Sequence, residues 1–319
     1  MGDRIPALAI DVGGTKLAAG VAEPGGRLIT WAQVPTPQDV DAEQLWLTLI
    51  ALIDRVLETA GTTGPGDLAG IGAGCGGPME WPSGLVSPLN IPAWRSFPLR
   101  DRLQERFAGS VVRVQNDAIC LVAAEHWRGA GRGQDNVLGM VVSTGVGGGL
   151  ILDGRVIEGA SGNAGHIGHV VVDPEDGPVC LCGGRGCLEA IARGPALVAW
   201  AQGVGWRPGQ PDGTAKDLAD DAAQGHPVAL AAMRRGGRAL GIAIASAACL
   251  CDFQVVSIGG GLSQAGAVLF DPLEEALRAH ARLDFVRHLR VVPAALGGSA
   301  GLVGAAALIL AGERYWTGD

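Results

Sequence analysis

The sequence predicts a mixed α/β protein made of two domains with similar topology. The chain has 319 residues, of which 48% are hydrophobic and 18% charged, and this suits a globular protein with one large or two medium domains. One pattern occurs twice, over residues 8–33 and 137–158: strand, glycine-rich turn, strand, short polar turn, strand. Because a helical region follows each copy, we expect two related α/β domains.

Charge and cysteine content exclude several classes of protein. A formal net charge of −8 argues against binding to nucleic acid or to anionic membranes. The longest apolar runs, 239–250 and 302–311, fall short of the ~20 residues that span a bilayer, so we expect buried helices there. The N-terminus lacks a signal-peptide core, and the seven cysteines do not resemble a disulfide scaffold. We therefore expect a cytoplasmic protein.

The first copy of the pattern predicts an antiparallel meander followed by a helix. Its three strands are expected at 8–11, 16–21 and 28–33. Asp41 should begin the helix, with Gln44 as its capping-box partner, and Gly61 should end it. A further strand is expected at 68–72.

Gly72, Gly74 and Gly77 spell the G-x-G-x-x-G pattern of dinucleotide-binding proteins. That pattern requires a helix directly after it, whereas Pro78 and the prolines that follow exclude one. We therefore expect these glycines in a loop that lines a cleft. Asn90, in the same irregular segment, is a candidate to present its amide to a ligand.

Asn116 and Asp117 stand between an expected strand, 111–115, and an expected helix, 118–128. A carboxylate at a helix N-terminus faces the positive end of the helix dipole, which favours its ionised form. The alternative is that both residues are ordinary helix caps. Local sequence leaves both interpretations open.

Two glycine turns, 13–15 and 144–147, occupy equivalent places in the two copies. Neither matches the Walker A pattern, but backbone N–H groups bared by glycine can hold phosphate oxygens. The hydroxyls of Thr15 and Thr144 add hydrogen-bond donors. We expect the two turns to face each other across a cleft.

The second half of the chain is expected to be largely helical. Pro227 suits the first turn of a helix that extends to Cys251, with Gly236 and Gly237 as a weak spot. A buried strand at 255–258 should end in three glycines, and the helix 302–311 should pack on the first domain. The Arg and His residues between 278 and 290 are expected on a solvated helix face.

The segment 161–189 concentrates groups that bind metals. Cys180, Cys182 and Cys187 form a C-x-C-x4-C pattern, with His169 upstream. Three thiolates and one imidazole make a closed tetrahedral zinc site, which would be structural because no coordination position stays open. Buried free thiols are the alternative, and the C-x-x-C spacing of a redox site is absent.

Six motifs together resemble the ROK family of sugar kinases over nearly the whole chain: IDVGGTK, QNDA, STGVGGG, AGHIGH, CLCGGRGCLEAIARG and SIGGGL. The resemblance implies an actin/hexokinase-like (RNase H-like) fold, in which two lobes close on ATP and a hexose, and a cytoplasmic homodimer. We expect the first lobe at 1–117, joined by the helix 300–319, and the second at 118–299 with the zinc segment.

The same resemblance assigns roles to individual residues. Asp117 matches the catalytic base that takes the proton of the sugar 6-hydroxyl, and Asp11 is expected near Mg²⁺. The residues that match ATP-binding positions are Asp11, Gly13, Gly14, Thr15, Lys16, Thr144, Gly145, Gly259, Gly260 and Gly261. Those that match sugar contacts are Asn90, Asn116, Asp117, His169 and Glu189. His169 would bind zinc through one ring nitrogen and the sugar through the other.

His166 departs from the AGExGH motif of the family, which has glutamate there. A glutamate only accepts hydrogen bonds, whereas a histidine can also donate one, and a donor suits the carbonyl of an N-acetyl group. The AGHIGH spelling resembles N-acetylmannosamine kinases more than glucokinases. We therefore include His166 among the sugar contacts and favour an N-acetylmannosamine-like substrate, with glucose as the alternative.

Two other hypotheses of function are weighed against a kinase. A ROK repressor would carry a winged-helix domain before the kinase-like part, but IDVGGTK begins at residue 10. A non-catalytic sugar sensor would be expected to lack Asp117 or the glycine turns, and all are present. Polyphosphate in place of ATP remains an open alternative.

Overall fold

The computed structural model describes residues 5–62, 64–209 and 213–318, which form two compact units. The first unit comprises the described parts of 1–132, 149–164 and 298–319, and the second comprises those of 133–148 and 165–297. These ranges differ from the lobes expected from the sequence, because helix α3 (Asp117–Arg128) packs on helix α9 (Ala300–Leu310) within the first unit. Gly304 allows this packing, since a Cβ there would collide with the carbonyl of Cys120.

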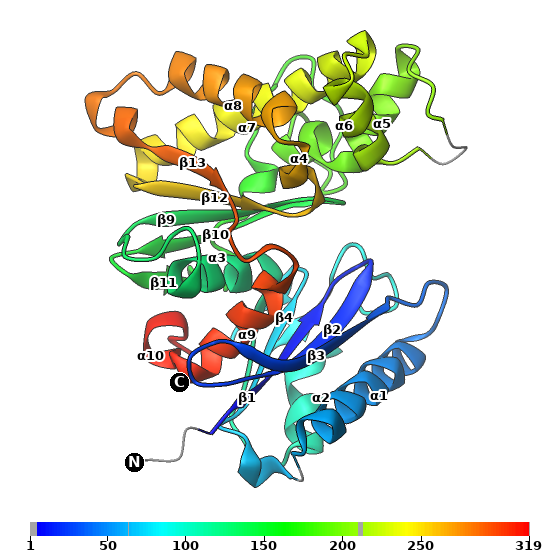
Figure 1. The fold of residues 1–319 in the computed structure, drawn as a ribbon, viewed down its shortest axis with the longest axis vertical. Helices are drawn as coiled ribbons and strands as arrows, with labels where there is room; N and C mark the ends of the chain where they lie inside the picture. The colour runs from blue at the N-terminus through cyan, green and yellow to red at the C-terminus, as the bar shows by residue number, and fades with distance from the viewer. Residues whose placement is uncertain (1–4, 63, 210–212, 319) are drawn as a thin grey trace. The chain divides into compact units, whose positions relative to one another are not determined.

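The first unit contains a five-stranded sheet in the order β3-β2-β1-β4-β8 (Figure 1). The strands are β1 (Ala7–Val12), β2 (Lys16–Ala22), β3 (Leu28–Pro35), β4 (Ile71–Cys75) and β8 (Val112–Asn116). The antiparallel meander β1-β2-β3 confirms the prediction, and β4 and β8 continue the sheet in parallel with β1.

The two faces of this sheet serve different purposes. Leu8, Ile10 and Val12 of β1 alternate onto one face, where they share a core with the apolar side chains of α1 (Ala42–Ala60). Asp11 is on the opposite face, beside Gly301 of α9. The period-two alternation thus places an acidic side chain among the helices α3 and α9 rather than in the α1 core.

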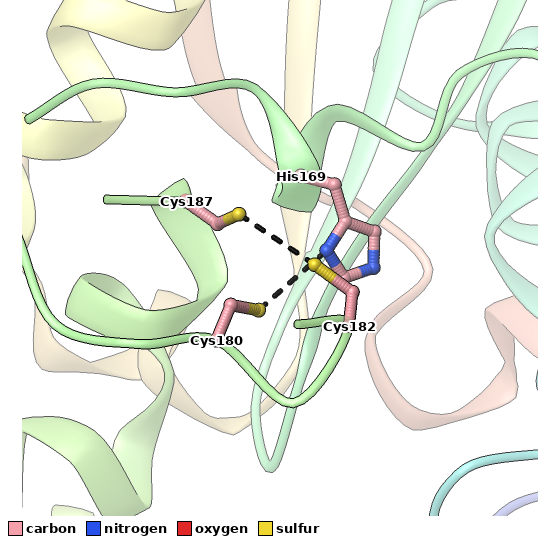
Figure 2. A group of neighbouring side chains, drawn as sticks. All are labelled: His169, Cys180, Cys182 and Cys187. Carbon is pink, nitrogen blue, oxygen red and sulfur yellow. Dashed lines mark hydrogen bonds between the residues drawn. The ribbon is translucent and has the colours of Figure 1, made fainter. Parts of the chain in front are cut away.

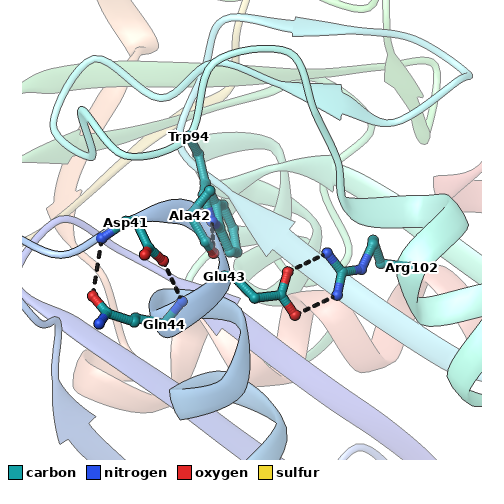
Figure 3. Close-up of polar contacts among 6 residues, drawn as sticks. All are labelled: Asp41, Ala42, Glu43, Gln44, Trp94 and Arg102. Carbon is teal, nitrogen blue, oxygen red and sulfur yellow. Dashed lines mark hydrogen bonds and ion pairs between the residues drawn. The ribbon is translucent and has the colours of Figure 1, made fainter.

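Helix α1 begins and ends where the sequence predicts. Asp41 and Gln44 form the reciprocal capping box, and Gly61 ends the helix in the left-handed conformation (Figure 3). Trp94 donates its indole N–H to the Ala42 carbonyl at 3.2 Å, so the loop before Trp94 is attached to the start of α1 (Figure 3).

The prediction that Gly72, Gly74 and Gly77 lie in a loop is wrong for the first two. Gly72 and Gly74 lie inside β4, which spans Ile71–Cys75 rather than 68–72, and not in a loop. A Cβ at Gly72 would collide with the Ala305 carbonyl of α9, and one at Gly74 would lie 3.1 Å from the Cys120 sulfur of α3. Both glycines therefore permit close packing of helices on the sheet.

The C-terminal residues of the chain make hydrogen bonds to other segments of the first unit. The other elements of this unit include the 3-10 turn Pro65–Asp67, β5 (Met79–Glu80), β6 (Leu85–Val86), β7 (Phe97–Pro98), α2 (Leu99–Arg106) and α10 (Gly312–Tyr315). The Tyr315 hydroxyl is 2.8 Å from Nδ1 of the buried His126, and Thr317 donates both its N–H and its hydroxyl to Glu158. These contacts attach the C-terminal residues to the first unit. The helix predicted at 302–311 is α9, which packs on α3, β4 and β1 of the same unit, as predicted.

A second five-stranded sheet has the order β11-β10-β9-β12-β13. Its strands are β9 (Val137–Val142), β10 (Val146–Leu152), β11 (Arg155–Ile157), β12 (Val255–Gly259) and β13 (Arg290–Pro293). β9, β12 and β13 are parallel, and β10 and β11 are antiparallel. This order repeats that of the first sheet, so the predicted similarity of the two sheets is confirmed.

Helices dominate the second unit. They are α4 (Leu188–Ala192), α5 (Gly194–Gly203), α6 (Ala215–Ala223), α7 (Pro227–Cys251) and α8 (Ala267–His280), together with 3-10 turns at Ile167–His169, Gly261–Ala265 and Asp284–His288. Helix α7 is continuous through Gly236 and Gly237, and the absent Cβ of Gly237 makes room for Leu269 and Pro272 of α8. The single helix face predicted for 278–290 is also wrong, since α8 ends at His280.

Candidate functional site

Asp117 is the first residue of α3, directly after the end of β8. The Asn116 side chain accepts the N–H of Ala118 at 3.0 Å and caps the helix, so the capping interpretation is correct for Asn116. Asp117 Oδ1 accepts the same N–H at 2.8 Å. A strand end followed at once by a helix start fixes both the backbone and the carboxylate of Asp117.

Burial dominates the electrostatics of Asp117 and Asp11. It raises the pKa of Asp117 above its ordinary value, although hydrogen bonds from the N–H groups of Ala118 and of Asp117 itself lower it. The pKa of Asp11 rises to about 6, mainly through burial and further through the charge of Asp117, against a lowering by Lys16. The helix N-terminus does favour an ionised Asp117, as expected, but burial outweighs it and the net shift of the pKa is upward.

This shift predicts how the stability of the ligand-free protein depends on pH. The folded-state pKa of Asp11, about 6, exceeds the ordinary 3.8, so the protonated group stabilises the fold below about 3.8 and this contribution is lost as the pH rises through about 6. Asp11→Asn removes the titration. We expect the variant to gain up to about 3 kcal/mol of unfolding free energy over the wild type between pH 4 and pH 8. Urea unfolding in a magnesium-free buffer without chelator measures this difference, and parallel pH curves would contradict the prediction.

The first glycine turn connects β1 to β2 and touches the predicted sugar contact Asn90. Gly13 N–H donates to the Lys16 carbonyl at 3.0 Å, which closes the turn. A Cβ added to Gly14 would lie 2.7 Å from Asn90 Cβ, so Asn90 rests directly on the turn. Lys16 reaches the Gly298 carbonyl at 3.5 Å. The first unit thus brings Asn90 and the turn 13–16 together.

The second glycine turn, between β9 and β10, lies beside the glycines that follow β12. The Ser143 N–H donates to the Gly145 carbonyl at 2.9 Å, so Thr144 lies between two residues that are hydrogen-bonded to each other. Gly260 has a φ of 89° and packs against the backbone of Val142, where a Cβ would come within 2.5 Å of the carbonyl oxygen. The second unit therefore brings together the residues expected at a phosphate and those expected at the adenosine.

The predicted sugar contacts of the second unit also form one group. The rings of His166 and His169 are 6.2 Å apart and nearly perpendicular. Glu189, in α4, accepts the N–H of Val146 at 2.8 Å, so the same carboxylate is attached to the second glycine turn. Burial and the neighbouring His169 lower the pKa of His166, while Glu189 opposes this shift. A neutral His166 can both donate and accept a hydrogen bond.

The predicted metal ligands converge (Figure 2). The ligand atoms of His169, Cys180, Cys182 and Cys187 all lie within 4.8 Å of one another. Cys182 and Cys187 sulfurs are 3.8 Å apart, and the Cys180 sulfur is 3.7 Å from His169 Nδ1. Four ligands at Zn–S distances of about 2.3 Å in a tetrahedron require sulfur separations of about 3.8 Å. The cluster is compatible with a structural zinc ion.

The thiols of the cluster differ in their electrostatics. Burial raises the pKa of Cys180 and raises that of Cys187 to about 12, whereas the Gly184 N–H lowers that of Cys182. Because a metal binds thiolates, its arrival would displace protons from the two raised thiols. His169 faces the sulfurs through Nδ1, which leaves Nε2 for another partner.

Three residues that support the site have no signal in the sequence. Thr36 and Gln38 hydrogen-bond to the first glycine turn, and Arg95 donates to the carbonyls of Pro88 and Ile91 on either side of Asn90. Their contacts join residues far apart in the chain, and no motif marks them. Only the proline neighbours of Thr36 set it apart locally.

Taken together, the two similar sheets, the half-buried aspartates and the glycine turn in each sheet define a hexokinase-like α/β fold. The chain belongs to the ROK family, whose model matches residues 7–311. It is 35% identical to a glucokinase of Thermotoga maritima over 96% of this chain and 98% of the relative. It is also 35% identical to an N-acetylmannosamine kinase of Escherichia coli, over 96% and 99%.

Among solved structures, the fold resembles a ROK family glucokinase from Streptomyces griseus in complex with glucose and AMPPNP. The TM-score is 0.82 at 34% identity, over 95% of this chain and 99% of the other. The actin/hexokinase-like fold class expected from the motifs is thus confirmed. Among the described residues, no helix is long and apolar enough to cross a membrane.

Proposed function

We propose that this protein is an ATP-dependent sugar kinase that transfers the γ-phosphate to the 6-hydroxyl of a hexose or N-acetylhexosamine. The observation that carries the proposal is the half-buried Asp117 at the start of α3, beside Asp11 and in the same unit as the first glycine turn. Similarity to glucokinases and N-acetylmannosamine kinases over almost the full chain supports it.

The proposed reaction assigns one task to each group. Asp117 accepts the proton of the 6-hydroxyl while that oxygen forms a bond to the γ-phosphorus and the bond from this phosphorus to the β–γ bridging oxygen breaks. A raised pKa suits Asp117, because a base is most effective when its pKa approaches the working pH. Asp11 would hold Mg²⁺, which neutralises charge on the phosphates when bound. Lys16 and the N–H groups of the turn would bind phosphate oxygens.

The second unit would supply the adenosine site and part of the sugar site. Thr144 and Gly145 would contact phosphate, and Gly259–Gly261 would pass beside the adenosine. His166, His169 and Glu189 would bind sugar hydroxyls from their shared group, and zinc would fix the ring of His169 through Nδ1. We also propose that the protein is cytoplasmic and forms a homodimer. Light scattering of the purified protein tests the homodimer.

Within this class we favour an N-acetylmannosamine-like substrate, with glucose as the alternative. His166 carries the preference, because a neutral histidine can donate a hydrogen bond to an N-acetyl carbonyl. His166→Glu removes this donor and adds an acceptor. We expect kcat/KM for N-acetylmannosamine to fall about tenfold or more relative to that for glucose. The exposed His288, in the same unit, supplies the control His288→Glu, and an unchanged ratio in His166→Glu would refute this assignment.

A coupled assay of ADP release tests the kinase itself. The panel comprises glucose, mannose, N-acetylmannosamine, N-acetylglucosamine, fructose and glucosamine, each with ATP or polyphosphate. Turnover of one sugar with ATP is the expected result. Turnover of none, together with sugar binding in calorimetry, would favour the alternative of a non-catalytic sugar sensor.

A further inference from the structure

Three successive carbonyls of the first glycine turn are hydrogen-bonded by one short segment, 36–38. The Thr36 hydroxyl donates to the Gly13 carbonyl at 2.6 Å, and Gln38 Nε2 donates to the Gly14 carbonyl at 3.3 Å. The backbone N–H of Thr36 donates to the Thr15 carbonyl at 3.0 Å. The segment therefore holds three consecutive peptide groups from the same side.

These three hydrogen bonds also fix the direction of the N–H groups on the opposite side of the turn. In a planar trans peptide, the N–H of one residue points away from the carbonyl of the residue before it. Fixing the carbonyls of Gly13, Gly14 and Thr15 toward 36–38 therefore directs the N–H groups of Gly14, Thr15 and Lys16 away from that segment. Successive N–H groups with a common direction form a site for an anion.

The segment 36–38 is itself held at both ends. Before it, β3 ends at Pro35, which is paired with Lys16 of β2. After it, the capping box at Asp41 fixes the start of α1. Thr36 is buried, with 5% of its surface exposed, whereas the Gln38 side chain is exposed. The hydroxyl of Thr36 therefore has a fixed position relative to the sheet.

We propose that Thr36 is a positioning residue for the nucleotide: it holds the turn 13–15 so that its N–H groups face the phosphates, and Gln38 assists it. The proposal rests on the proposed function, in which this turn binds ATP. It assigns Thr36 no contact with either substrate, so its loss should affect nucleotide binding and leave sugar binding nearly unchanged.

The test uses Thr36→Val, which keeps the shape of the side chain but removes the donor, and Thr36→Ser, which keeps the donor. Thr48→Val is the matched control, because the Thr48 hydroxyl also donates to a backbone carbonyl, at 2.9 Å, but in the exposed part of α1. Calorimetry measures the Kd of MgADP without sugar, and steady-state kinetics give the KM values for ATP and sugar.

We expect Thr36→Val to raise the Kd of MgADP and the KM of ATP about tenfold, as the loss of one hydrogen bond would. The sugar KM should stay within about twofold, Thr36→Ser should restore most of the nucleotide affinity, and Thr48→Val should match the wild type. Should Thr36→Val fail to fold, Gln38→Met, at an exposed side chain, should raise the Kd of MgADP about threefold.

Several outcomes would overturn the positioning role. One is an unchanged MgADP affinity in Thr36→Val, or in Gln38→Met if Thr36→Val does not fold. The others are an equal loss of sugar and nucleotide affinity in Thr36→Val, and a nucleotide affinity in Thr36→Ser as low as in Thr36→Val. If the wild type binds MgADP but phosphorylates no sugar, the proposed kinase activity is refuted. The positioning role is then decided by the MgADP affinity of Thr36→Val in calorimetry alone. A wild type that does not bind MgADP overturns both.

Discussion

Asp117→Asn is expected to lower kcat by about 10²- to 10⁴-fold, the usual contribution of a positioned general base. The amide oxygen of asparagine can still accept the Ala118 N–H, so the start of α3 should keep its structure. What the variant loses is the ability to take a proton. Steady-state kinetics with the preferred sugar measure the fall in kcat, and calorimetry should show sugar and nucleotide affinities within a few fold of the wild type.

A second acidic residue at a helix start supplies the control for this variant. Asp101 lies in the first turn of α2, is exposed, and belongs to the same unit as Asp117. Asp101→Asn should leave kcat unchanged. Full activity in Asp117→Asn would show that another group accepts the proton and would refute the proposed mechanism.

Removal of the metal ligands is expected to have the largest effect on stability. Structural zinc sites contribute about 10–16 kcal/mol of apparent binding free energy near neutral pH, and this is available only to the folded site. In Cys187→Ser we expect the bound zinc to fall from about one ion per chain to nearly none. The unfolding free energy should fall by several kcal/mol.

The same variant should affect the sugar more than the nucleotide. His169 and Glu189 belong to the segments that the cluster holds together, since Cys187 immediately precedes the helix α4 that carries Glu189. Losing the metal would release the ring of His169. We therefore expect the sugar KM to rise at least tenfold, and the ATP KM to change much less.

Cys249 is the matched control for the metal site. It is exposed on α7 and does not belong to the four-residue cluster. Cys249→Ser should retain zinc, measured by elemental analysis, and unfold as the wild type does. Equal zinc content and equal stability in Cys187→Ser would refute a structural zinc site.

Features that depend on neighbouring residues could be predicted from the sequence. Asp41 and Gln44 form the capping box because both partners lie within one helical turn, and Pro227 begins α7 because its ring suits a first helical turn. The C-x-C-x4-C spacing places three thiols within reach of one ion for the same local reason. Family motifs then identified the ROK family, which spacing rules alone do not reach.

Packing between distant segments decided the rest. Gly72 fits the dinucleotide pattern in sequence, but the Ala305 carbonyl, more than two hundred positions away, determines its place inside a strand. The helix N-terminus at Asp117 predicts that the ionised form of the carboxylate is favoured. The burial that raises its pKa arises only when separate segments surround it.

The sequence by itself therefore determined most of the elements and the spacing of the candidate thiol ligands, because short-range geometry specifies them, whereas the candidate base followed from the family motifs. Only the tertiary structure decided which carbonyls Thr36 holds and how burial changes the aspartates. The physical reason is that a hydrogen bond to a distant backbone and the exclusion of water both depend on the whole fold, and neither leaves a pattern in the local sequence.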